Sequence, residues 1–198
     1  MFAFAIYDPK RNGIFIARDR FGKKPLHYID DPDGFYFASE IKALLAIDEI
    51  RLKVSVDPCS LSDFLSLGYI LTPKTAYKEI RQLPAAHAAF YSIDQKCLRV
   101  WLYWKLEDFV ARDPAPYDNI AKQRFSEILE DAVRLRLRAD VEVMGHLSGG
   151  LDSSSLMAIA TKLSKHPIRA TCIGFDDASY DESVLARQSA TALGPVDS

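Results

Sequence analysis

The sequence has few of the features that place a protein in a membrane or in a nucleic-acid complex. Its 198 residues contain no apolar run long enough to span a bilayer, and the apolar start lacks the basic segment of a secretion signal. The 25 lysine and arginine residues are outnumbered by 27 acidic residues, so the net charge of −2 does not favour electrostatic binding of nucleic acid. We therefore expect a cytoplasmic protein that binds neither membranes nor nucleic acid.

Cysteine is also scarce, and neither cysteine nor histidine has the spacing of a metal site. Cys59, Cys97 and Cys172 are odd in number and widely spaced among apolar neighbours, which favours reduced structural thiols over disulfides or zinc ligands. The four histidines lack metal-ligand spacing as well: His27, His87, His146 and His166. Only His146 is close in sequence to the loop described next, and packing explains it more simply than contact with a nucleotide. The sequence assigns no metal ligand.

The most informative motif in the sequence is the run of residues 148–154, which we call the Gly-Gly loop. It lies between an apolar stretch typical of a strand (141–147) and one typical of a helix (156–163). Two adjacent glycines let the backbone approach an anion closely, and the following helix offers its positive N-terminal end. Ser153 and Ser154 add hydroxyl donors. The loop lacks the lysine of a Walker motif, so it predicts phosphate binding for a different nucleotide chemistry.

The Gly-Gly loop resembles the PP-loop of ATP pyrophosphatases, which cleave ATP between the α- and β-phosphates and hold the departing pyrophosphate. A chance Gly-Gly turn is the alternative, but seven matching residues in this context favour the PP-loop. Upstream segments resemble the later part of the glutaminase domain, an Ntn-type hydrolase, in glutamine-dependent asparagine synthetases. The matching segments are residues 1–8, 17–26, 37–44, 68–69, 83–84, 103–104, 135–140, 173–175 and 179–182. The resemblance covers almost the whole chain, and only residues 195–198 depart from it.

The resemblance implies an ATP-dependent, glutamine-hydrolysing asparagine synthetase with aspartate, glutamine and ATP as substrates and Mg²⁺ as cofactor. In the intact enzyme an acyl-adenylate forms, pyrophosphate leaves, and ammonia from glutamine displaces AMP. The resemblance also implies that Asp152 orders the loop or a metal-bound water, and both roles stay open. The residues expected to bind ATP are Leu147, Ser148, Gly149, Gly150, Asp152, Ser153, Ser154 and Ile173.

The resemblance further implies that the chain is an internal fragment of a longer synthetase. The glutaminase of this family uses an N-terminal cysteine as nucleophile, whereas this chain begins Met1-Phe2. We therefore expect no catalytic residue within the chain and no glutamine hydrolysis by this polypeptide. A homo-oligomer is compatible with the sequence.

The hydrophobic pattern predicts a mixed fold, α+β followed by α/β. Residues 1–105 are predicted to form three hairpins, and the strands of the first two are apolar on both faces, as in a layered αββα sandwich. The resemblance implies that this part is the C-terminal part of an Ntn-type sandwich. Residues 106–118 are the expected linker, and residues 119–198 read as the start of a doubly wound parallel PP-loop domain. The expected strands are 2–7, 14–17, 26–29, 35–38, 88–93, 98–104, 141–147 and 169–175, and the expected helices are 39–45, 60–68, 120–133, 156–163 and 182–193.

Residues 18–24, which we call the Arg-Asp loop, connect the first two hairpins. The Arg18-Asp19-Arg20 triplet is either a substrate clamp or a structural ion-pair network. Gly22 and Pro25 indicate that the shape of the loop is the constraint, so we favour the structural interpretation.

Three alternative functions remain. A related amidotransferase that acts on another carboxylate would share nearly every motif. A different PP-loop enzyme, such as one that thiolates tRNA, would lack the hairpin region before residue 105. A non-enzymatic, nucleotide-binding fragment is the third alternative.

Overall fold

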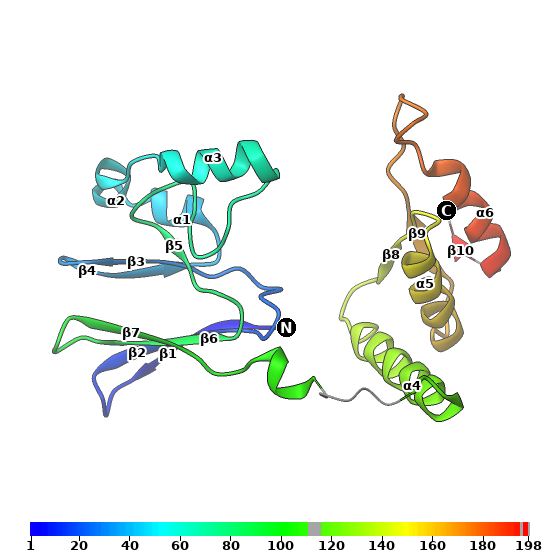
Figure 1. The fold of residues 1–198 in the computed structure, drawn as a ribbon, viewed down its shortest axis with the longest axis horizontal. Coiled ribbons are helices and arrows are strands. Elements are labelled where there is room, and N and C mark those ends of the chain that lie inside the picture. The colour runs from blue at the N-terminus through cyan, green and yellow to red at the C-terminus, as the bar shows by residue number, and fades with distance from the viewer. Residues whose placement is uncertain (111–115, 195, 198) are drawn as a thin grey trace. The chain divides into compact units, whose positions relative to one another are not determined.

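The computed structural model describes residues 1–110, 116–194 and 196–197 of the chain, and all statements below concern these residues. They form two compact units, Met1–Arg112 and Asp113–Ser198 (Figure 1). Each unit has its own core and is described by itself. Within the described residues, no helix combines the length and the apolar character that crossing a membrane requires.

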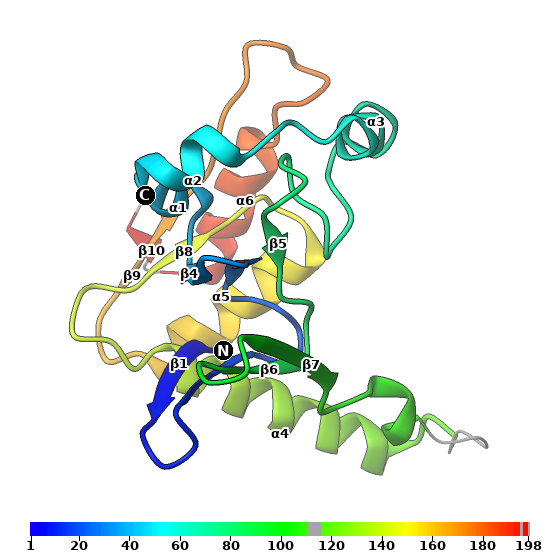
Figure 2. The ribbon, with the colours of Figure 1, turned by 90° about the vertical axis from the view of Figure 1, so that its left-hand side faces the viewer.

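The first unit contains two antiparallel sheets with three helices over one of them (Figures 1 and 2). The first sheet has the order β1-β2-β6-β7, from β1 (Ala3–Asp8), β2 (Gly13–Arg18), β6 (His87–Ser92) and β7 (Cys97–Leu102). The second has the order β4-β3-β5, from β3 (His27–Asp31), β4 (Gly34–Ala38) and β5 (Arg81–Gln82). The helices are α1 (Ile41–Leu45), α2 (Asp48–Lys53) and α3 (Pro58–Leu67). All three predicted hairpins are confirmed, as β1–β2, β3–β4 and β6–β7.

Two apolar cores hold these layers together, because β3 is apolar on both faces. Tyr28 joins a cluster with Ile16 and Ala89 of the first sheet, whereas the next residue, Ile29, packs with Leu44 of α1. The outer face of the first sheet carries an aromatic row, Phe4, Phe15 and Trp101, with ring centroids 6.0 Å apart at each step. In Figure 1, no labelled helix of this unit lies on the side of the first sheet that faces away from β3 and β4, so the complete αββα sandwich stays a prediction.

Two helices of the first unit do not begin where the sequence predicts. The helix expected over 39–45 is α1, which begins at Ile41 after Glu40, and no side chain caps it. The helix expected over 60–68 is α3, which begins at Pro58 because the side chain of Asp57 accepts a hydrogen bond from the Cys59 N–H. The hydrophobic pattern does not predict α2 and β5, because both elements are too short for a clear hydrophobic period.

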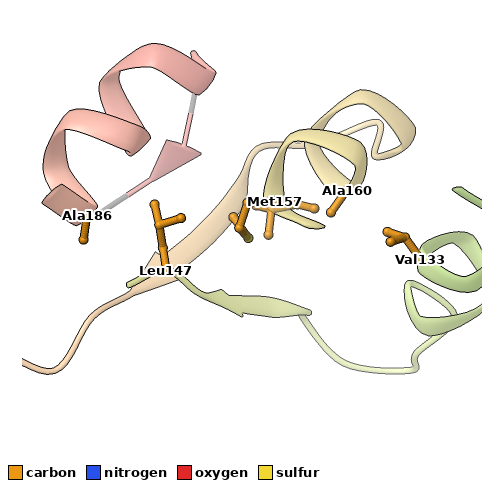
Figure 3. Close-up of a cluster of buried hydrophobic side chains, with 6 residues drawn as sticks. Val133, Leu147, Met157, Ala160 and Ala186 are labelled. Atoms are coloured by element: carbon orange, nitrogen blue, oxygen red, sulfur yellow. The ribbon is translucent and has the colours of Figure 1, made fainter. Parts of the chain in front are cut away.

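The second unit is a three-stranded parallel sheet covered by helices. Its elements are α4 (Asn119–Arg136), β8 (Met144–His146), α5 (Leu151–Leu163), β9 (Ile168–Thr171), α6 (Ser183–Leu193) and β10 (Val196–Asp197), and the sheet order is β10-β9-β8. Val133 of α4, Met157 of α5 and Ala186 of α6 share one buried cluster with Leu147 (Figure 3). The predicted β-α-β-α order is confirmed, but β8 and β9 are shorter than expected, and α5 begins at Leu151 instead of 156.

A short 3-10 helix, η1 (Leu106–Phe109), lies in the segment 106–118 that was expected to be a linker. Residues 111–115 of that segment lie outside the described residues. The expected domain bounds, 1–105 and 119–198, therefore stay predictions.

Candidate nucleotide-binding site

The Gly-Gly loop leads from the end of β8 into the first turn of α5. Leu147, only 1% exposed, donates its N–H to the Thr171 carbonyl oxygen at 2.9 Å, which fixes the start of the loop beside β9. Gly149 then adopts φ +81°, a left-handed conformation that favours glycine. Only here does the loop require glycine for its backbone angle, since Gly150 has φ −72° and ψ 163°. The two glycines therefore have different roles.

The N-terminus of α5 is open to an anion. Gly150 is its N-cap residue and has no side chain to bond the first N–H groups of the helix. These N–H groups and the helix dipole place partial positive charge at the end of the loop. The loop can therefore bind phosphate oxygens through its backbone.

The serine hydroxyls of the loop bond to other protein groups. Ser153 Oγ accepts the Ser148 N–H at 3.2 Å, lies 3.0 Å from Ser148 Oγ, and donates to the Gly150 carbonyl at 3.2 Å. Ser154 Oγ donates to Ser189 Oγ of α6 at 3.3 Å. Ser153 thus closes the loop on itself, and Ser154 connects α5 to α6.

Asp152 behaves differently from the serines. Its side chain is exposed in the first turn of α5, and no described residue forms a hydrogen bond or ion pair with its carboxylate. Mg²⁺ in nucleotide sites is held by one or two carboxylates together with phosphate oxygens and water. A single free carboxylate beside a phosphate-binding backbone fits that pattern, although no group of three or more potential ligands occurs among the described residues.

A cavity of about 670 Å³ opens at the carboxyl ends of β8 and β9. Of the eight residues predicted to bind ATP, Leu147 alone lines this cavity, and the predicted residues of the Gly-Gly loop do not. Ile173 is 65% exposed between the lining residues Cys172 and Gly174. Other lining residues are not among the predicted ones: Phe175, Asp181, Ala186, Arg187 and Ala190. The predicted helix 182–193 follows a strand of the same parallel sheet, which indicates that its start lies near this edge but not which of its residues face the cavity.

The Arg-Asp loop of the first unit is a closed structural network. The Arg18 guanidinium is buried and donates to three carbonyl oxygens, those of Lys24 (2.8 Å), Leu83 (2.7 Å) and Gly22 (2.7 Å). The Asp19 carboxylate accepts four backbone N–H groups, from Phe2 (3.3 Å), Phe21 (3.2 Å), Lys23 (3.0 Å) and Lys24 (3.0 Å). The structural interpretation is confirmed for Arg18 and Asp19, but the expected ion-pair network is wrong, because both side chains bond to backbone.

The pKa values of this pair follow from the same contacts. Burial lowers the pKa of Arg18, and the charge of Asp19 partly opposes that effect. Burial would raise the pKa of Asp19, but the four N–H groups outweigh it and hold the pKa at about 2. Both side chains are therefore charged at neutral pH, and both form their hydrogen bonds with backbone groups of the protein.

The cysteines, His146 and the basic end of α4 are the remaining candidates, and of these only Cys172 lines the 670 Å³ cavity. All three cysteines are free and exposed, so the expectation that they pack as structural thiols is wrong. His146 is exposed at the end of β8 and lines an apolar hollow with Met157, which is separate from the 670 Å³ cavity. At the end of α4, Arg134 forms ion pairs with Glu130 (3.1 Å) and Asp131 (3.0 Å) of the same helix.

Comparison with known proteins assigns the two parts of the chain to two families. The glutamine amidotransferase domain family matches residues 1–104, and the asparagine synthase family matches residues 124–196. A putative glutamine-hydrolysing asparagine synthetase 2 of Methanocaldococcus jannaschii is 37% identical over 186 residues, which cover 92% of this chain and 35% of that protein. A glutamine-hydrolysing asparagine synthetase 3 of Bacillus subtilis is 41% identical over 182 residues, 89% of this chain and 28% of that protein.

A third relative has a different kind of name. The protein called amidase chry2 in Gibberella zeae is 32% identical over 209 residues, covering 98% of this chain and 30% of that protein. The chain spans about a third of the length of the curated relatives it matches. The two family matches, together with relatives that are 37% and 41% identical over most of this chain, show that the chain belongs to the glutamine-dependent asparagine synthetase family.

Proposed function

We propose that this chain carries the ATP-binding part of a glutamine-hydrolysing asparagine synthetase. One observation carries the proposal: the Gly-Gly loop, with Gly149 at φ +81°, connects β8 of a parallel sheet to the uncapped start of α5, and the residue before it, Leu147, lines a cavity of about 670 Å³. The backbone offers donors for phosphate, and the cavity has room for an adenosine group.

The predicted residues take distinct parts in this proposal. The backbone N–H groups of Gly149 and Gly150 bind the phosphates that leave as pyrophosphate, where a preorganised dipole stabilises developing charge. Ser148 and Ser153 hold the loop in its bonded shape, and Ser154 connects the loop's helix to α6. Leu147 lines the adenosine side, and Ile173 would reach it from the exposed segment after β9.

Asp152 is the proposed contact to Mg²⁺, directly or through water. Its carboxylate has no partner among the described residues, so a loop-ordering role has no hydrogen bond to act through. When bound, Mg²⁺ would share the negative charge of the pyrophosphate. Asp152 would hold the metal at the start of α5, next to the backbone donors.

The reaction itself is inferred from the family. The side-chain carboxylate of aspartate attacks the α-phosphorus of ATP, the bond to the β-phosphate oxygen breaks, and pyrophosphate leaves. Ammonia released from glutamine then attacks the acyl carbon and AMP departs. A related amidotransferase that acts on another carboxylate is the second candidate, because amidase chry2 matches the same segment. An unrelated tRNA-thiolating PP-loop enzyme is disfavoured by the amidotransferase match over residues 1–104.

The family also supports the finer fold proposals. The two sheets of the first unit have an apolar core between them, as the inner layers of an Ntn-type αββα sandwich require. The parallel order β10-β9-β8 is half of a doubly wound sheet, with β8 at the position where the strand order would reverse.

Calorimetric titration of the chain with ATP, with and without Mg²⁺, tests the proposal directly. We expect saturable binding of ATP that added pyrophosphate weakens by competition and that Mg²⁺ strengthens. A chain that is folded by circular dichroism but binds neither ATP nor pyrophosphate would contradict the proposal.

The acceptor is tested in the whole protein by pyrophosphate release from ATP. We expect release that depends on aspartate. Release that depends on another carboxylate and not on aspartate would instead support the second candidate.

A further inference from the structure

The first turn of α6 lies directly against the Gly-Gly loop. A Cβ atom built on Gly149 would lie 2.5 Å from Leu185 Cβ, 2.7 Å from the Leu185 carbonyl carbon and 2.9 Å from the Ala186 nitrogen. Two of these three neighbours are backbone atoms, which cannot rotate away as the end of a side chain can. The space left for Gly149 therefore depends on where α6 begins.

One carboxylate defines that beginning. Glu182, the N-cap residue of α6, contributes no side-chain cap. The Asp181 carboxylate instead accepts the Ser183 N–H at 3.1 Å and the Ser183 hydroxyl at 2.8 Å. Asp181 thus performs the capping that the residue next to it does not.

The same carboxylate also binds the segment after β9. It accepts the Phe175 N–H at 3.4 Å, and both Phe175 and Asp181 line the 670 Å³ cavity. The hydroxyl and N–H of Ser183 lower the pKa of Asp181, so the group is ionised at neutral pH. Three protein donors occupy its oxygens, so Asp181 acts on its surroundings mainly through Ser183 and Phe175.

We propose that Asp181 is a positioning residue of the ATP site, which fixes the first turn of α6 against Gly149 and thereby sets the shape of the Gly-Gly loop. The inference rests on the proposed binding of ATP. If this is correct, replacing Asp181 weakens the binding of the phosphates more than the binding of adenosine, because Gly149 belongs to the phosphate side of the site.

The test measures binding of Mg·ATP and of adenosine to the chain and its variants by calorimetry. We expect Asp181→Ala to weaken ATP binding about tenfold and adenosine binding at most about threefold. Asp181→Asn keeps an oxygen that accepts the Ser183 N–H, so we expect ATP affinity within about threefold of the unaltered chain.

Asp177→Ala is the matched control. Asp177 accepts the N–H and hydroxyl of Ser179 at 2.9 and 2.7 Å, in the same arrangement four residues earlier, but it does not line the cavity. We expect its loss to change ATP affinity less than about twofold.

Four results would overturn the inference. ATP binding by Asp181→Ala within twofold of the unaltered chain would do so and leave the proposed function intact. Equal losses for ATP and adenosine would point to general loosening of the unit. If Asp181→Ala does not fold, the variant Ser183→Ala tests the inference instead, because it removes only the hydroxyl bond to Asp181. ATP binding that is about threefold weaker in Ser183→Ala supports the inference, and unchanged ATP binding overturns it. An unaltered chain that binds no ATP removes the proposed function and the inference together.

Discussion

The Arg-Asp loop and the Gly-Gly loop look alike in sequence but differ in what their polar groups do. Each follows a strand, includes an aspartate and has a glycine with positive φ, +62° at Gly22 and +81° at Gly149. In the Arg-Asp loop, four backbone N–H groups satisfy the buried Asp19 carboxylate. In the Gly-Gly loop, Asp152 is exposed without a described partner, and a helix N-terminus is left uncapped.

The comparison gives a physical criterion for telling a structural loop from a binding loop. A buried polar group costs free energy unless it is bonded, so a loop that serves only the fold uses its donors and acceptors internally. A binding loop keeps donors free and places them where solvent and ligand can reach. By this criterion the Arg-Asp loop is structural, because the carboxylate of Asp19 is satisfied within the protein. The Gly-Gly loop is a binding loop, because the carboxylate of Asp152 and the N-terminus of α5 are available to a ligand.

The largest expected effect comes from opening the closed loop. Asp19→Ala removes the acceptor of four N–H groups in a site where the side chain is only 4% exposed, so we expect it to destabilise the first unit by about 3–5 kcal/mol. Urea unfolding followed by tryptophan fluorescence measures this unit alone, because both tryptophans, Trp101 and Trp104, belong to it.

Asp8→Ala is the control for that experiment. Asp8 accepts two backbone N–H groups, from Lys10 (3.0 Å) and Arg11 (3.2 Å), in an exposed turn that water can reach. We expect a loss below about 1 kcal/mol. Similar losses for Asp8→Ala and Asp19→Ala would mean that burial does not distinguish the Arg-Asp loop from an ordinary turn.

Gly149→Ala should have the next largest effect, and it separates the two glycines of the open loop. Its Cβ would meet Leu185 Cβ at 2.5 Å while the backbone holds φ +81°, so we expect about 2–4 kcal/mol of destabilisation and at least tenfold weaker ATP binding. A Cβ on Gly150 would find only Ser148 Oγ, at 3.5 Å, so Gly150→Ala should fold normally. Urea unfolding followed by circular dichroism and ATP titration measure both variants. Equal stability of Gly149→Ala and Gly150→Ala would contradict this prediction, since it would mean that α6 shifts to make room for the new methyl group.

The sequence was sufficient for the parts of this comparison that depend on local chemistry. The hairpins, the strand–loop–helix context of the Gly-Gly loop and the structural role of Asp19 all follow from period, turn residues and glycine placement. The sequence could not show that α5 starts at Leu151, because the apolar period begins only later in the helix. It also could not show that Asp181 and Arg187 line the cavity, since that depends on how α6 packs.

A smaller effect is expected when acid titrates the closed loop. The folded pKa of Asp19, about 2, lies below its ordinary value of 3.8, so its stabilisation is fully present above pH 3.8 and is lost as the pH falls through 2. The loss should reach about 2 kcal/mol. Other carboxylates also titrate in this range, so the measurement is the difference in unfolding free energy between the unaltered chain and Asp19→Asn at each pH. A difference that does not shrink between pH 4 and pH 2 would contradict the assignment of this pKa to the four N–H bonds.

The smallest effect on stability is expected from Asp152→Asn in the open loop. Because no described residue bonds this carboxylate, the free energy of unfolding should change by less than about 0.5 kcal/mol. ATP binding without Mg²⁺ should stay the same or strengthen, since a negative charge near the phosphates is removed, whereas the gain in affinity that Mg²⁺ gives should fall several-fold. Asp140→Asn removes an exposed charge elsewhere in the same unit and should leave the gain from Mg²⁺ unchanged. A gain that persists in Asp152→Asn would exclude this carboxylate as the contact to Mg²⁺, and the free charge at the start of α5 would then need another explanation.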